Sequence, residues 1–327
     1  MAMIEKAVGP NEPLVTHLFT ADPSAHVFEG RIYIYPSHDI DHDGPTNDNG
    51  DQYVMEDYHV LSMENITSPC VDHGAALHIK DVPWASQQMW APDAAYRDGT
   101  YYLFFPARDK EGIFRIGVAT SSSPAGPFQA KESYIPGSFS IDPAVFVDDD
   151  DRVYMYFGGL WGGQLEKWQT GAFQPDAIEK GPEEPAYKPR LAELSDDLLT
   201  FKAAPHEIDI IDEDGKPLLA GDEERRYFEG PWMHKYNGRY YLSYSTGSTH
   251  KIVYAMSDNP CGPFVFQGMI LSPVLGWTTH HSIVEFGGKW YLFYHDASLS
   301  GGVDHLRSVK FTELHYDEDG RIQPISL

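Results

Sequence analysis

The chain has 327 residues, of which 42% are hydrophobic and 13% aromatic, enough for a large core at a length that all-β folds often reach as one domain. Its 24 basic and 49 acidic residues give a net charge of −25, which disfavours nucleic-acid partners and anionic membranes. Two cysteines and an N-terminus without an apolar run of signal-peptide length favour a cytoplasmic protein, although a leader already removed would leave the same sequence.

Five copies of one motif follow along the chain: a carboxylate or histidine, a few apolar residues, a tight turn and an aromatic-rich run. The residues that open the copies are, in chain order, Asp22, Asp93, Asp142, Glu229 and His280. The turns are Glu29-Gly30, Asp98-Gly99, residues 149–151, Asn237-Gly238 and Gly287-Gly288. Because each turn joins two apolar runs, the pattern predicts five β-hairpins.

Two of the units also share a later strand and loop. Residues 114–119 and 251–256 read as strands, and both lead into near-identical loops at 122–128 and 257–264. Repeated antiparallel units that need neighbours to bury their faces predict an all-β fold, a five-bladed β-propeller spanning residues 1–327 as a single domain. A β-sandwich with accidental internal similarity is the alternative. The sequence leaves open whether residues 1–15 close the ring against the first blade.

Acidic and proline-rich segments interrupt the repeats. We expect surface loops at residues 171–186 and 208–224. Residues 39–44 read like the opening of an EF-hand loop, but the twelfth position is Gly50 instead of Glu, so an acidic loop near the mouth of the propeller is the better interpretation. His38 and Asp39 directly follow the first aromatic run and are candidate pocket-lining, substrate-binding residues.

Four of the opening residues are carboxylates, and three of these, Asp22, Asp142 and Glu229, are expected at the starts of inner strands, where acids are unfavourable. Asp22 and Asp142 each precede a proline, so a turn-capping role is the alternative for each. In a propeller, however, the starts of the inner strands gather at one mouth of the central channel. Asp22, Asp142 and Glu229 would then supply the acid and the base that glycoside hydrolysis needs, with a third carboxylate to raise the pKa of the acid.

The ordered set of motifs resembles glycoside hydrolase family 43 over nearly the whole chain. The matching segments are Thr20-Ala21-Asp22-Pro23-Ser24, Trp90-Ala91-Pro92-Asp93-Ala94, Ser140-Ile141-Asp142-Pro143-Ala144, Glu229-Gly230-Pro231 and His280-His281-Ser282-Ile283-Val284. The resemblance implies a five-bladed propeller and an inverting enzyme that acts on xylose- and arabinose-containing polymers. It also implies that Asp22 is the general base, that Glu229 is the general acid, and that Asp142 raises the pKa of Glu229 and orients it. Asp93 receives no reactive role.

The resemblance extends to further site residues. It implies that His280 holds a divalent metal ion, calcium being frequent in the family, and His281 is a departure from the family pattern; a packed structural histidine is the alternative. Trp90 is a candidate for stacking on a sugar, with core packing as its alternative. Arg307 resembles the arginine that hydrogen-bonds the terminal sugar, with a buried salt bridge as its alternative.

These observations predict an exo-acting, inverting glycoside hydrolase that releases terminal pentoses from xylo- or arabinoxylo-oligosaccharides, a β-xylosidase with possible α-L-arabinofuranosidase activity. The partner is a small oligosaccharide, and the loop at residues 39–52 would close one side of the mouth. An endo-arabinanase and a non-catalytic carbohydrate-binding propeller are the alternatives. The sequence leaves open whether the chain forms a homo-oligomer.

Overall fold

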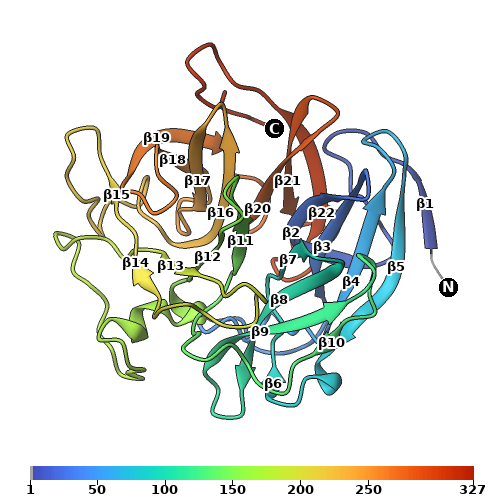
Figure 1. Ribbon diagram of the computed structural model, residues 1–327, viewed down its shortest axis with the longest axis horizontal. Helices are drawn as coiled ribbons and strands as arrows, with labels where there is room; N and C mark the ends of the chain where they lie inside the picture. Colours follow the sequence, from blue (N-terminus) through green and yellow to red (C-terminus); the bar gives the residue numbers. More distant parts are fainter. Residues whose placement is uncertain (1–2) are drawn as a thin grey trace.

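The five predicted hairpins all form in the computed structural model, which describes residues 3–327. Four of the turns place two consecutive residues in the left-handed region, as in Asn237 (φ 48°) and Gly238 (φ 76°). This backbone geometry matches the right-handed twist of the flanking strands, which is why Gly follows Glu, Asp, Asn or Gly at these turns. The hairpins build five sheets around one axis, so the predicted five-bladed β-propeller is confirmed (Figure 1).

The first two sheets carry the N-terminal part of the chain. The first blade runs from the outer edge inward as β1 (Met3–Ala7), β5 (Pro69–His78), β4 (Asp57–Met63), β3 (Arg31–Asp39) and β2 (Phe19–Phe28). The second blade consists of β10 (Gln129–Ala130), β9 (Phe114–Ser121) and β8 (Thr100–Asp109), with β8 paired to both β7 (Asp93–Arg97) and β6 (Ala85–Gln87).

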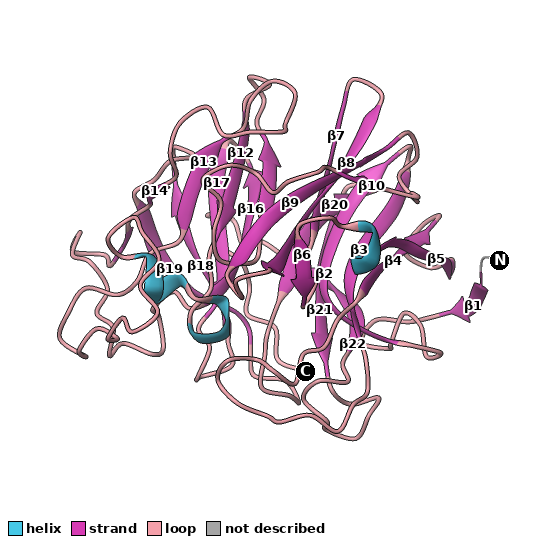
Figure 2. Ribbon diagram, turned by 90° about the horizontal axis from the view of Figure 1, so that it is seen from below, coloured by secondary structure: helices cyan, strands magenta, loops and turns pink. Residues whose placement is uncertain are grey.

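The remaining sheets follow in chain order. The third blade is β14 (His206–Glu207), β13 (Arg190–Glu193), β12 (Val153–Phe157) and β11 (Ala144–Val147). The fourth is β15 (Ile210–Ile211), β19 (Phe264–Leu271), β18 (Ile252–Ser257), β17 (Arg239–Ser245) and β16 (Glu229–Tyr236). The fifth is β22 (Ser308–Leu314), β21 (Lys289–Asp296) and β20 (His281–Phe286). Three short 3-10 helices lie between strands, η1 (Ile79–Asp81), η2 (Trp161–Gly163) and η3 (Leu165–Trp168) (Figure 2).

The inner strands β2, β7, β11, β16 and β20 contact one another in sequence, and β20 returns to β2, so they surround the central channel. The ring is closed without a covalent link. Backbone N–H groups of Asn11, Leu14 and Thr20 donate to carbonyls of β22 and its approach, at 2.8 to 2.9 Å. The N-terminal segment therefore completes the three-stranded fifth blade, while β1 pairs with the outer edge of the first blade.

The hydrophobic core lies between the blades. Buried rings and aliphatic side chains from adjacent sheets fill the interfaces, for example Tyr35 and Leu103 between the first and second blades. The two similar loops recognised in the sequence occupy equivalent positions. The Tyr35 hydroxyl donates to the Pro124 carbonyl at 2.7 Å, and the Tyr156 hydroxyl donates to the Pro260 carbonyl at 2.6 Å. Among the described residues, no helix has the length and apolar character needed to cross a membrane.

Candidate active site

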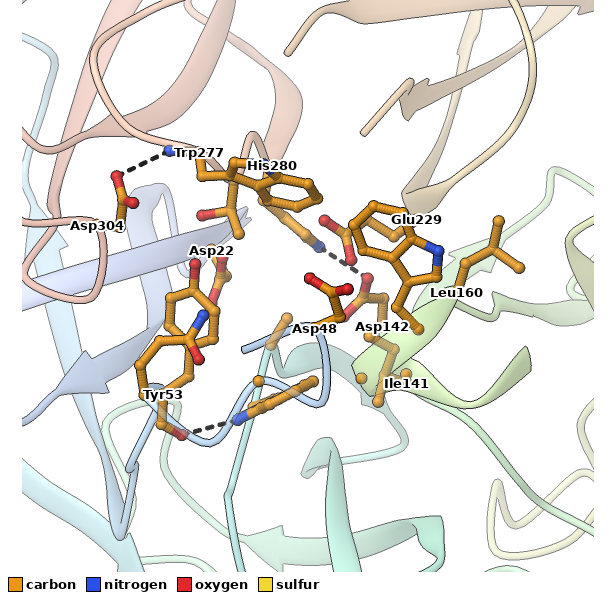
Figure 3. A pocket seen from close by; sticks show the side chains of 18 of the residues that line it. Asp22, Asp48, Tyr53, Ile141, Asp142, Leu160, Glu229, Trp277, His280 and Asp304 are labelled. Carbon is orange, nitrogen blue, oxygen red and sulfur yellow. Dashed lines mark hydrogen bonds and ion pairs between the residues drawn. The ribbon is translucent and has the colours of Figure 1, made fainter. Parts of the chain in front are cut away.

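A pocket opens at the mouth of the channel, and residues from all five blades line it (Figure 3). Asp22 lies on one side of this pocket, with Asp142 and Glu229 on the other and His280 between them (Figure 3). The structure thus brings together the four residues to which the sequence assigned acid, base and metal-binding roles.

Local backbone irregularities aim the acids into the pocket. Asp22 and Asp142 adopt left-handed conformations, with φ of 49° and 58°. The β2–β3 register shifts between Ala21 and Ser24, and the β16–β17 register shifts just after Glu229. Bulges of this kind redirect a side chain away from the regular pleat. Asp is among the few non-glycine residues that tolerate the left-handed region, which explains its presence within β2 at position 22 and just before β11 at position 142.

Asp22 is buried and held by hydrogen bonds in its ionised form. Its carboxylate accepts from Ser37 Oγ at 2.7 Å and from Arg307 Nη1 at 3.1 Å. Its backbone N–H donates to His295 Nδ1 at 2.9 Å. Burial opposes ionisation, but the positive charge of Arg307, with help from nearby histidines and Ser37, lowers the pKa of Asp22 to about 2. Asp22 is therefore a carboxylate at neutral pH.

Asp142 and Glu229 form a second, protonated centre. Burial raises the pKa of both carboxyls, and repulsion from the other carboxylates of the pocket raises them further. Asp142 Oδ2 accepts a hydrogen bond from the Gly230 backbone N–H at 2.9 Å, which ties it to the residue that follows Glu229. The pair therefore holds a proton at neutral pH, while Asp22 does not.

His280 is the histidine that faces the acids. It is buried, and neither ring nitrogen has a hydrogen-bond partner among the described residues. Its Nε2 lies 3.9 Å from Asp142 Oδ2. His281 points away and its Nε2 is hydrogen bonded to Ser243 Oγ at 2.6 Å, so the adjacent histidines have different environments.

The family model for Glycosyl hydrolases family 43 matches residues 12–322 of the chain. The chain belongs to glycoside hydrolase family 43. It is therefore a glycoside hydrolase, as the ordered motifs predicted.

Several proteins resemble this family 43 chain over nearly its full length. A xylosidase/arabinosidase 43A of Humicola insolens is 61% identical over 95% of this chain and 98% of its own length. A β-xylosidase of Xylanibacter ruminicola is 48% identical over 94% of this chain and 97% of its own length. A solved structure matches with a TM-score of 0.95 at 62% identity and covers 100% of this chain and 99% of that one. That protein is a family 43 β-xylosidase/α-arabinofuranosidase from a compost microbial metagenome, in complex with xylotriose and in a calcium-free form.

Trp90 and Arg307 both line the pocket of this family 43 member. The Trp90 ring packs against Phe114 at a centroid distance of 4.6 Å, and its Nε1–H donates to the Tyr53 carbonyl at 2.9 Å. It thus combines the predicted pocket position with core packing, and stacking on a sugar stays a prediction.

Arg307 uses its guanidinium within the protein. Besides Asp22 it contacts Asp39 through Nε at 2.9 Å and Nη2 at 2.7 Å, and Thr278 Oγ1 through Nη1 at 2.9 Å. The buried salt bridge that the sequence left as an alternative therefore forms. A direct hydrogen bond from Arg307 to the sugar stays a prediction.

The structure differs from the expectation that His38 and Asp39 line the pocket, since neither does. Asp39 is buried beneath Arg307, and the Arg307 backbone N–H also donates to it at 2.8 Å. His38 is its neighbour on β3 and its side chain is hydrogen bonded to Asp57 at 2.6 Å, outside the pocket. Alternate side chains of a strand face opposite sides, so these two adjacent residues could not both point at one ligand.

Asp93 has a structural position, in agreement with its lack of an assigned reactive role. It does not line the pocket. Its carboxylate accepts from the Ser24 hydroxyl and from the Val145 backbone N–H at 2.5 Å, and it contacts His26 Nε2 at 2.6 Å. Asp93 thereby links the inner strands of the first three blades.

The sequence reasoning missed several pocket residues. Trp161 and Trp277 line it with their ring centroids 5.6 Å apart, and the Arg307 guanidinium lies over the Tyr53 ring. The loop through Asp48 also lines the pocket, as its acidic character had indicated. Trp277 lies three residues before His280, so proximity to a motif was the one signal that could have found it.

Proposed function

We propose that this family 43 chain is an exo-acting, inverting β-xylosidase with α-L-arabinofuranosidase activity, which releases terminal pentoses from short xylo- and arabinoxylo-oligosaccharides. The main support is the charge pattern of the pocket, where an ionised Asp22 faces the protonated Asp142–Glu229 pair. The names of the relatives support the sugar: xylosidase/arabinosidase for one and β-xylosidase for another.

In the proposed reaction, a water molecule lies between Asp22 and the anomeric carbon of the terminal sugar. Asp22 accepts a proton from this water as its oxygen bonds to the anomeric carbon. The bond to the leaving oxygen breaks in the same step, and Glu229 donates its proton to that oxygen. A single displacement of this kind inverts the anomeric configuration. When the proton of the pair lies on Glu229, the negative charge of Asp142 favours that protonated form of Glu229.

The residues that line the pocket support removal of terminal sugars. The loop through Asp48 lines one side, and the partly exposed rings of Trp161 and Trp277 also line it. Indole rings offer apolar faces on which a second sugar of a short oligosaccharide can stack. An endo-acting enzyme needs a groove that is open at both ends, which this lining does not favour.

The residues around His280 fit a divalent ion. This buried imidazole has two ring nitrogens without a protein partner among the described residues, and it lies beside Asp142. We propose that His280 holds a calcium ion, with water and substrate oxygens supplying the remaining ligands that calcium prefers. The bound ion would supply positive charge next to the carboxylates. Chelation with EDTA is expected to lower activity, and added Ca²⁺ to restore it; unchanged activity in a protein shown by elemental analysis to be metal-free would contradict this role.

Two variants separate the roles of the acid and the base. Glu229→Ala is expected to lose about 10²–10⁴-fold of its activity on xylobiose but much less on a nitrophenyl xyloside, whose leaving group needs little protonation. Asp22→Ala is expected to lose activity on both substrates by a similar factor, because the attack by water is impaired for each. Equal losses on both substrates for Glu229→Ala, or retention of the anomeric configuration in an NMR time course of the wild type, would overturn the proposal.

A further inference from the structure

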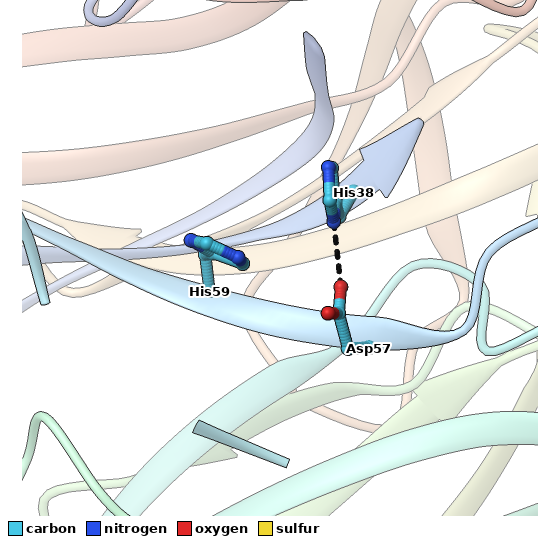
Figure 4. Close-up of side chains that lie close together, drawn as sticks. All are labelled: His38, Asp57 and His59. Atoms are coloured by element: carbon cyan, nitrogen blue, oxygen red, sulfur yellow. Dashed lines mark hydrogen bonds and ion pairs between the residues drawn. The ribbon is translucent and has the colours of Figure 1, made fainter. Parts of the chain in front are cut away.

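A second cluster of metal-ligand side chains lies in the first blade, outside the pocket (Figure 4). His38 belongs to β3, whereas Asp57 and His59 belong to β4. One ligand atom from each of the three residues lies within 4.8 Å of the others. We propose that His38, Asp57 and His59 form a binding site for a divalent transition-metal ion such as Zn²⁺, separate from the catalytic pocket.

Hydrogen bonds already orient the cluster. His59 Nδ1 lies 2.9 and 3.1 Å from the two carboxylate oxygens of Asp72, which leaves Nε2 to offer its lone pair. Asp72 is itself fixed, because the Gly74 backbone N–H donates to it at 2.8 Å and His17 Nε2 lies 2.8 Å from it. A carboxylate behind a histidine is the usual arrangement around metal-binding imidazoles, since it fixes the tautomer and the ring orientation.

The donor set selects the class of ion. Two imidazoles and one carboxylate suit zinc and neighbouring transition metals, whereas calcium favours sites in which most ligands are oxygen atoms. The side chains of His38, Asp57 and His59 are 22%, 17% and 15% exposed, so an ion can reach them from solvent. Water can occupy the remaining coordination position of a tetrahedral ion.

The cluster lies where the backbone pairing between β3 and β4 has stopped. The ladder joins Ile32 to Met63 and ends at Ile34 and Leu61. Pro36 follows on β3 and has no N–H to donate. Beyond this point the contact between His38 and Asp57 bridges the two strands through side chains. A metal ion bound here would cross-link β3 and β4.

The same stretch of β3 also supports the catalytic pocket. Ser37 donates to the Asp22 carboxylate, and Asp39 binds Arg307. His38 lies between them and faces the opposite side of the strand. The bound ion would therefore stabilise the segment of β3 that positions Asp22. Its expected effect is a higher thermal stability of the folded protein.

The test uses full-length protein stripped of metal and carrying His280→Ala, so that the pocket has lost its imidazole. Equilibrium dialysis against Co²⁺ or Zn²⁺ is expected to give one bound ion per chain, and Co²⁺ to show a visible absorption band. Zn²⁺ at a hundredfold excess over its Kd is expected to raise Tm by about 4 °C. Adding His59→Gln is expected to abolish the bound ion, the band and the Tm shift.

His73→Gln is the matched control, because His73 lies next to Asp72 on β5 and is hydrogen bonded to Ser62 instead of to the cluster. This control is expected to keep the bound ion. Asp57→Asn, which keeps a hydrogen-bonding group toward His38, gives a second decisive variant if His59→Gln fails to fold. Absence of Co²⁺ binding in the His280→Ala protein, or binding that survives both cluster variants, would overturn the proposal.

Discussion

Among single residues, Arg307 has the widest influence on the pocket. Its guanidinium lies between the carboxylates of Asp22 and Asp39, and all three side chains are buried. Burying charges is costly unless each one has partners, and here the fork of Arg307 meets both oxygens of Asp39. Arg307, whose positive charge keeps Asp22 ionised, is therefore held in place by Asp39, which lies outside the pocket.

Removing the support of Arg307 tests this arrangement. Asp39→Asn leaves a buried guanidinium with one carboxylate fewer, so the free energy of unfolding is expected to fall by about 3–5 kcal/mol. Urea unfolding followed by circular dichroism measures the change. Glu313→Gln, which removes a partly exposed partner of Lys289, is the control and is expected to unfold close to the wild type. Equal stability of Asp39→Asn and the wild type would contradict the view that Asp39 supports Arg307.

A buried histidine makes stability depend on pH. Burial lowers the pKa of His234 to about 3, and its Nε2 lies 2.7 Å from the Tyr316 hydroxyl. The unfolded chain binds a proton near pH 6.5 whereas the folded chain does not, so stability is lost as the pH falls below that value. His234 alone is expected to lower the free energy of unfolding by about 2 kcal/mol between pH 7 and pH 5.

The variant His234→Gln isolates that contribution. Its free energy of unfolding is expected to change less between pH 7 and pH 5 than that of the wild type, as measured by urea titrations at the two pH values. His315→Gln, at an exposed position, is the control and should keep the wild-type dependence. A His234→Gln protein with the full wild-type dependence would assign the effect to other groups.

Among elements, the hairpins and the loops differ in how far the sequence predicted them. The hairpins carried local signals, since a turn residue such as Gly238 sits between two aromatic runs. The starts of the inner strands, and therefore Asp22 and Glu229, followed from those hairpins. The positions of Trp161 and Tyr53 depend on loops whose path is set by contacts distant in sequence, so no local pattern marked them. His38 was expected at the pocket because it directly follows an aromatic run, but no pattern in the sequence indicated that β3 extends to Asp39 or which side of it His38 faces.

Gly50, in the loop that lines the pocket, occupies a position where a larger residue does not fit. Gly50 has φ 75°, and a Cβ atom there would lie 2.4 Å from Trp90 Cη2. Gly50→Ala is expected to displace the loop and raise KM for xylobiose several-fold, while the blades stay folded. Steady-state kinetics with xylobiose and a thermal melt measure the two effects.

Gly215→Ala is the matched control for this prediction. Gly215 has φ 79°, so the substitution adds the same backbone strain, but no atom lies within 4 Å of its Cβ position. The KM of Gly215→Ala for xylobiose should equal that of the wild type. An increase of KM in both variants would show that backbone strain, and not the contact with Trp90, causes the effect.

At the scale of the whole molecule, the ring depends on the segment that joins the first and fifth blades. Leu14 and Val15 are buried there, among side chains that include Phe293 and Phe311 of the fifth blade. Leu14→Ala is expected to lower the free energy of unfolding by about 2–5 kcal/mol, because a buried leucine leaves a cavity. Urea unfolding checks the value.

The control for the ring closure is Ile4→Ala in β1. Ile4 is 72% exposed and lies in the strand that pairs with the outer edge of the first blade. The free energy of unfolding of Ile4→Ala should stay near that of the wild type. If Ile4→Ala were as destabilising as Leu14→Ala, the outer strand would contribute to closure as much as the inner segment does. The sequence left open whether residues 1–15 close the ring. It could not predict that the closing segment would pair with β22.

The distance in sequence between Asp22 and Arg307 has a consequence during biosynthesis. The two partners are 285 positions apart, so a ribosome makes Asp22 roughly 15 to 60 s before Arg307. During that interval the nascent chain carries a carboxylate whose guanidinium partner has not yet been translated. Of the five blades, the fifth, which supplies both Arg307 and His280, emerges after the other four. Each newly made molecule therefore acquires its hydrolytic capacity only after the fifth blade has been made, and chains that lack this blade are expected to be inactive.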